Sequence, residues 1–139
     1  MFINTIESIR KITKKRYLIV FLALALNACR TAPIYNSTDI SISPRSTATD
    51  KEIGEAIWSA GRSLEWRIKK VRPGQMSGVF KKNTHRAVVA IHYDKAHFNI
   101  LYQDSDNLKY DGNDIHVNYN VWIHKLEQKI QNKINFNLP

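Results

Sequence analysis

Few residues of this chain have the types and the spacing that catalysis requires. Ser105, Asp114 and His116 supply the three functional groups of a nucleophilic hydrolase, but no Gly-x-Ser-x-Gly turn surrounds the serine. The four glutamates after residue 28 all fall in predicted helices, so no pair of carboxylates faces a cleft for glycoside cleavage. We therefore expect no enzyme, and a hydrolase at Ser105 and His116 is the least favoured hypothesis.

Metal and cofactor chemistry is not indicated either. The five histidines lack the close paired spacing of a zinc motif, and the chain has a single cysteine. Asp104 and Asp106 begin like an EF-hand loop, but Lys109 stands where glycine is required and Ile115 where glutamate closes the loop. No glycine-rich phosphate-binding loop is present. We expect neither a metal nor a cofactor.

The cysteine ends a segment that is typical of exported proteins. Five basic residues precede an uncharged run of ten residues from Tyr17 to Leu26, and this order is that of a secretory signal peptide. A transmembrane helix needs about 20 apolar residues, roughly twice this length. Leu26, Asn27, Ala28 and Cys29 resemble the lipobox of bacterial lipoproteins.

The lipobox resemblance implies a lipid anchor. In that family the cysteine sulfur receives a diacylglyceryl group, and cleavage then leaves the acylated cysteine as the first residue, here Cys29. Two or more acyl chains hold a protein stably on a membrane. Arg30 follows the cysteine where aspartate would imply retention at the inner membrane. We expect residues 1–28 to be removed and the protein to be lipid-anchored in the bacterial envelope, at the outer membrane facing the periplasm.

The charge of the mature chain is moderately positive. The full chain has a net charge of +9 from 21 basic and 12 acidic residues; the signal peptide holds five and one of these, which leaves 16 and 11, a net +5. A basic surface suits nucleic acid, anionic lipid or an acidic polymer. Nucleic acid is disfavoured by the compartment, and the short basic runs at 69–72 and 81–82 are interpreted as solvated ends of elements. The expected partners are the membrane, through the anchor, and an envelope protein or the cell wall.

The mature chain divides into three segments. Residues 29–48 are rich in Ser and Thr and lack a helical period, which indicates a flexible tether. Within them, Ile40 and Ile42 alternate with serine, so a short edge strand is the alternative. Residues 49–135 carry regular apolar patterns and form the one domain that this length allows, and 136–139 are a tail.

Two amphipathic helices are predicted at the ends of the domain. A capping-box pattern at 49–52 begins the first helix, which ends before Pro73 and Gly74. Asn113 or Asp114 caps the second. The apolar positions at helical spacing are Ile53, Ile57, Ala60, Leu64 and Ile68 in the first helix, and Ile115, Tyr119, Trp122, Ile123, Leu126, Ile130 and Ile134 in the second.

Three alternating runs between the helices predict an antiparallel meander. Turns at 83–84 and 95–96 place Phe80 opposite Ala87 and Tyr93 opposite Phe98, and these registers keep the apolar side chains on one face. Covering that face with both helices hides all three apolar surfaces. The predicted fold is therefore a two-layer α+β domain in the order α-β-β-β-α.

The uncovered sheet face is the first candidate binding site. A modest apolar centre with a polar rim is expected there, which we interpret as a contact surface for a partner; an ordinary exposed sheet is the alternative. The residues of this centre are Val79, Val88, Ala90 and Leu101.

The polar loop at 104–114 is the second candidate. Asn107, Tyr110 and Asn120 are the residues that would bind a small ligand or a glycan there. The alternative is that such side chains hold the loop and its buried aromatic rings through structural hydrogen bonds.

A pattern across the third strand and the last helix resembles a group of small, uncharacterised proteobacterial lipoproteins. It reads I-x-Y-x-x-S-x-N-L-x-Y from Ile100, then Y-N-x-W-x-x-x-L from Tyr119. The resemblance spans residues 54–130 and the lipobox, and it implies one lipid-anchored domain without implying an activity. The favoured function is a non-catalytic interaction module in the periplasm, with ligand or glycan binding as the alternative.

Overall fold

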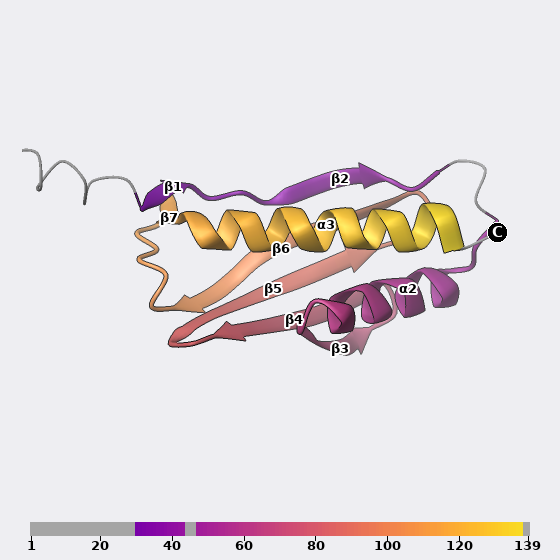
Figure 1. Cartoon of the computed structure of the whole chain (residues 1–139). Coiled ribbons are helices and arrows are strands. Elements are labelled where there is room, and N and C mark those ends of the chain that lie inside the picture. The colour runs from indigo at the N-terminus through magenta and orange to yellow at the C-terminus, as the bar shows by residue number, and fades with distance from the viewer. Residues whose placement is uncertain (1–29, 44–46, 138–139) are drawn as a thin grey trace, which may run out of the picture. The chain divides into compact units, whose positions relative to one another are not determined.

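The computed structural model describes residues 30–43 and 47–137 (Figure 1). The described residues from Thr31 onward belong to one compact unit. The predicted signal peptide and the lipidation site at Cys29 lie outside the described residues.

The first layer of this unit is an antiparallel sheet of five strands (Figure 1). Its centre is the predicted meander, and the predicted registers are confirmed, with Phe80 opposite Ala87 and Tyr93 opposite Phe98. One further strand on each side extends it beyond the three strands predicted. In spatial order the strands are β2 (Ser37–Ser41), β6 (His97–Asp106), β5 (His85–Tyr93), β4 (Gln75–Lys82) and β3 (Arg67–Arg72).

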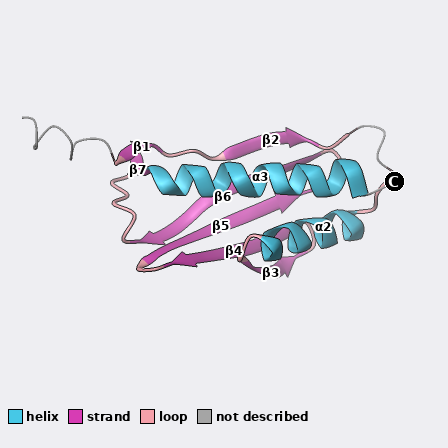
Figure 2. Cartoon of the chain, viewed as in Figure 1, coloured by secondary structure: helices cyan, strands magenta, loops and turns pink. Residues whose placement is uncertain are grey.

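The second layer consists of α2 (Asp50–Ser63) and α3 (Val117–Asn137), which lie side by side on the same face of the sheet (Figure 2). Their apolar stripes and the inner face of the sheet form one core. Ile57, Ile91 and Ile123 are fully buried in it. The prediction of an α+β domain with two helices on one sheet face is therefore confirmed.

The first helix is shorter than predicted. Its capping box is present, because Thr49 Oγ1 accepts from the Glu52 amide at 3.3 Å while the Glu52 carboxylate accepts from the Thr49 amide at 2.8 Å. The helix ends at Ser63, Glu65 adopts a positive φ of 66°, and the chain continues as β3. Ile68 fits both a helical stripe and strand alternation, and it is buried opposite Gly78 as a strand residue.

The prediction of a flexible tether over residues 29–48 is wrong where the structure describes strands. β1 (Thr31–Pro33) pairs with a later strand, and β2 adds to β6 as the edge strand that was the alternative. Ile42 and Ala48 are 4% and 5% exposed, so this segment contributes to the core. Apolar burial and the long edge of β6 together order a sequence that looks like a linker.

The last helix begins later and ends later than predicted. Asp114 belongs to β7 (Asp114–His116), which pairs with β1 and places Ile115 opposite Ala32. The predicted caps at Asn113 and Asp114 are therefore wrong, and the helix starts at Val117. Ile115 is fully buried in the strand, which explains why its apolar character matched the helical stripe. The helix also includes residues 136–137 of the predicted tail.

Candidate functional site

The outer face of the sheet has the predicted apolar centre. Val79 lies opposite Val88 and Ala90 opposite Leu101, as the registers require. Val79, Val88 and Leu101 are partly exposed, whereas the short Ala90 side chain is 5% exposed. Both described helices pack on the other face (Figure 2), so none of them covers this centre.

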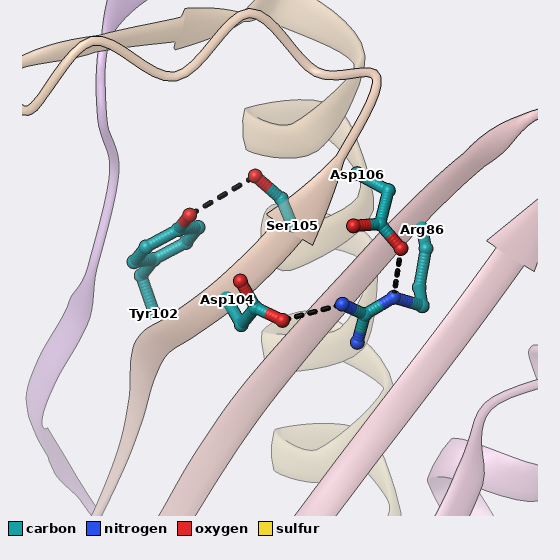
Figure 3. Close-up of polar contacts among 5 residues, drawn as sticks. All are labelled: Arg86, Tyr102, Asp104, Ser105 and Asp106. Carbon is teal, nitrogen blue, oxygen red and sulfur yellow. Dashed lines mark hydrogen bonds and ion pairs between the residues drawn. The ribbon is translucent and has the colours of Figure 1, made fainter.

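On the β6 side, the charges of this face are neutralised within the domain. Arg86 forms ion pairs with Asp104 and Asp106 (Figure 3). A register shift between Val88 and Val89 places Asp104 opposite Val88 and Asp106 opposite Arg86. The hydrogen bond from Arg86 lowers the pKa of Asp106, and the two carboxylates raise the pKa of Arg86. Residues 104–106 are thus strand rather than the start of the predicted loop.

On the β3 side, the structure describes no acidic partner for the charges of the same face. Arg67 lies opposite Val79 and Lys69 opposite Ser77. These four side chains line an open hollow of about 430 Å³. Within the described part of the chain, neither Arg67 nor Lys69 forms an ion pair. The face is therefore electrostatically asymmetric.

The three residues of the predicted ligand loop contact three different parts of the domain. Asn107 donates from Nδ2 to Thr84 Oγ1 at 2.7 Å, which joins the end of β6 to the β4–β5 turn. The Tyr110 hydroxyl donates to the carbonyl of Gly112 at 3.1 Å. In each case the polar group has a partner inside the chain.

Asn120 holds the N-terminal segment against α3. Its Oδ1 accepts from the Tyr35 amide and its Nδ2 donates to the Pro33 carbonyl, both at 2.9 Å. The Tyr35 ring stacks on His124 with 3.9 Å between centroids, and its hydroxyl donates to Glu127 at 2.6 Å. Burial, followed by the bond to Glu127, raises the pKa of Tyr35. These contacts match the structural alternative for Asn120.

Three tyrosine rings form an aromatic cluster around Tyr102. The Tyr102 ring is 4.4 Å from that of Tyr110 and 5.7 Å from that of Tyr119, measured between centroids. Tyr119 is fully buried, and its hydroxyl has no hydrogen-bond partner among the described residues. Burial is the main reason why the pKa of Tyr119 is raised.

The residues of the hydrolase hypothesis have other partners. The Ser105 hydroxyl lies 3.0 Å from the Tyr102 hydroxyl (Figure 3). His116 Nδ1 accepts from the Asn118 amide at 3.2 Å, and its ring lies 5.6 Å from that of His85.

Three further observations bear on function. Among residues 30–43 and 47–137, no three His, Cys, Asp or Glu side chains gather closely enough to hold a metal ion. No helix of that same part is long and apolar enough to cross a membrane. Comparison with protein-family models, curated proteins and solved structures finds no match.

Proposed function

We propose that this chain is a lipid-anchored protein of the bacterial cell envelope that acts as a non-catalytic interaction module, and that its outer sheet face contacts the partner. The observation that carries the proposal is the uncovered apolar centre formed by Val79, Val88 and Leu101. Most of the other large apolar side chains of the described domain are buried in one core. Apolar surface that stays on the outside at the centre of a sheet is typical of contact surfaces.

The anchor is supported by the N-terminal sequence. A basic start, an apolar run too short to span a bilayer and a lipobox-like ending at Cys29 together favour acylation of that cysteine. An acylated module stays at the membrane, where it meets its partner at a high local concentration. The proposal therefore combines a fixed location with a single contact surface.

Labelling with radioactive palmitate tests the anchor. Cells that express the full chain should incorporate label into the wild type and not into Cys29→Ser. An unlabelled wild type, or a Cys29→Ser variant that is labelled equally, contradicts the anchor.

Site-specific photocrosslinking tests the surface. A photoreactive side chain at Val88 or Leu101 of the full chain should give the same discrete adduct. The matched control is Val121, a 46% exposed position on the helix layer, which should not give it. Adduct formation at Val121 alone, or at none of the three positions, contradicts the proposed contact surface.

Ligand or glycan binding near the loop is a second candidate. The observation in its favour is Tyr110, which is 38% exposed and whose ring packs on that of Tyr102. A tyrosine offers a ligand both an apolar ring and a polar hydroxyl. A ligand that binds only the folded state raises its melting temperature. Thermal shift of the full chain with envelope glycans should show this increase, and Tyr110→Ala should abolish it; an unchanged melting temperature contradicts this candidate.

A further inference from the structure

The strand β3 is an uncovered sheet edge. It pairs with β4 in regular register over the four residues from Arg67 to Lys70, and a register shift follows only between Lys70 and Arg72. Within the described residues no strand pairs with its other side (Figure 1). The opposite edge, β2, is interrupted by a register shift, and Asp39 there has a φ of 56°. A regular edge strand presents alternate N–H and C=O groups outward, ready to pair with another strand.

A groove runs beside this edge, between β3 and α2. It has a volume of about 340 Å³, and Trp58, Ile68 and Met76 contribute its apolar part. Trp58 is 44% exposed although it is among the largest apolar side chains, and the Arg62 guanidinium lies 4.7 Å from its ring centroid. A strand added to β3 would direct every second side chain into this groove.

The basic residues of β3 indicate which kind of strand could pair with this edge. Arg67, Lys69, Lys70 and Arg72 make four of the six residues of β3 basic, and none of them forms an ion pair in the described part of the chain. Pairing with β3 of a second copy would place basic residues opposite one another, which is unfavourable. The carboxylates of an acidic strand would instead meet Arg67 and Lys69, which lie on the face of β3 away from the groove.

We propose that β3 and the adjoining groove bind an extended acidic segment of another protein by β-strand addition. Main-chain hydrogen bonds supply affinity in this mode, and alternate side chains supply specificity. The segment's apolar side chains enter the groove beside Trp58, and its carboxylates face Arg67 and Lys69. The inference rests on the proposed function as an interaction module, but it concerns the sheet edge rather than the outer face.

Hydrogen–deuterium exchange of the full chain with a synthetic peptide of alternating glutamate and valine tests the pairing. The peptide should slow exchange of amides within Arg67–Arg72 and change the fluorescence of Trp58, assigned with Trp58→Phe. A peptide with prolines in place of the valines lacks half of the main-chain donors and should lose this protection. Equal binding of the proline peptide, or binding without protection of β3, overturns the inference.

Two charge reversals test the proposed attraction between the acidic peptide and the basic residues of β3. Lys69→Glu should weaken binding of the glutamate–valine peptide about tenfold, because an attraction becomes a repulsion. Lys109→Glu makes the same change of net charge at an exposed position after β6 and should leave affinity within about twofold. Unchanged melting temperatures show that both variants fold; equal weakening by both, or no binding by the wild type, overturns the inference.

The peptide experiments and the tests of the proposed function can fail independently of each other. If the glutamate–valine peptide does not bind β3, crosslinking from Leu101 and palmitate labelling of Cys29 still test the proposed function. Failure of the palmitate labelling, in turn, leaves peptide binding by β3 unaffected.

Discussion

The end of β6 and the strand β3 are both rich in polar and charged side chains, but within the described residues only the first region pairs acidic with basic groups. Asp104 and Asp106 pair with Arg86, and Asn107 joins a neighbouring turn. The basic residues of β3 have no acidic partner in the described structure. Polar groups with internal partners stabilise a fold, whereas charges kept apart from opposite charges remain available for binding.

The largest expected effect comes from disrupting the packing of α2 against β3. A Cβ at Gly61 would lie 2.7 Å from Ile68 Cδ1, so Gly61→Val forces α2 away from the strand. Overpacking of this kind costs about 3 kcal/mol at its upper end. Urea unfolding should show this loss, and Glu55→Val, an exposed position of the same helix, should not. Equal stability of the two variants would mean that α2 does not position β3.

The next effect concerns the hydrogen bonds between α3 and the N-terminal segment. Asn120→Ala removes two hydrogen bonds to the segment at 33–35 and should cost about 2 kcal/mol, at about 1 kcal/mol per bond. Asn118→Ala on the same helix removes an exposed side chain and should stay within about 0.5 kcal/mol of wild type. Both values follow from urea unfolding. Similar values for the two variants would contradict the holding role of Asn120.

In the tyrosine cluster, two similar variants should change the free energy of unfolding in opposite directions. Tyr119→Phe removes a buried hydroxyl without a partner and should stabilise the fold by about 1 kcal/mol. Tyr102→Phe removes a hydrogen bond to Ser105 and should destabilise it by about 1 kcal/mol. Thermal unfolding of both variants checks the prediction, which fails if Tyr119→Phe is the less stable of the two.

The smallest effect is the pH dependence of the Arg86 ion pairs. The pKa of Asp106 is lowered from 3.8 in the folded state, so its contribution to stability is present above that value and disappears as pH falls through the folded pKa. Asp106→Asn should therefore lose less stability on acidification than the wild type. Urea midpoints at about pH 7 and about pH 3 measure this difference. Glu55→Gln is the control, and an acid response of Asp106→Asn equal to that of wild type contradicts the prediction.

The centre of the fold was predictable because local patterns specify it. Alternation and two short turns define the registers of β4, β5 and β6, and helical spacing defines α3. The strand β3 was not predictable, because Ile68 fits the helical and the strand period equally well. Only its pairing with Gly78 in the folded chain favours the strand. The pairing of β1 with β7 likewise depends on contacts such as Pro33 with Asn120, which are 87 positions apart.

The candidate sites were likewise predictable only where local sequence patterns specify them. The outer sheet face followed from the register, so the neighbours of Val79 and Leu101 were correctly placed. The polar residues Asn107 and Asn120 looked suited to a ligand, but their partners come from segments that are distant in sequence. The helical stripe of the first helix predicts that the basic run at 69–72 ends that helix. Its position at an exposed sheet edge depends on the earlier end of α2 at Ser63.

The early start of β1 has a consequence for how an acylated form would behave. This strand begins at Thr31, two positions after Cys29. Two fully extended residues reach about 7 Å, far less than the thickness of a single leaflet. If Cys29 were acylated, a linker this short would keep the domain at the membrane surface and away from distant binding partners. The domain would meet only molecules that diffuse along the bilayer surface or reach down to it.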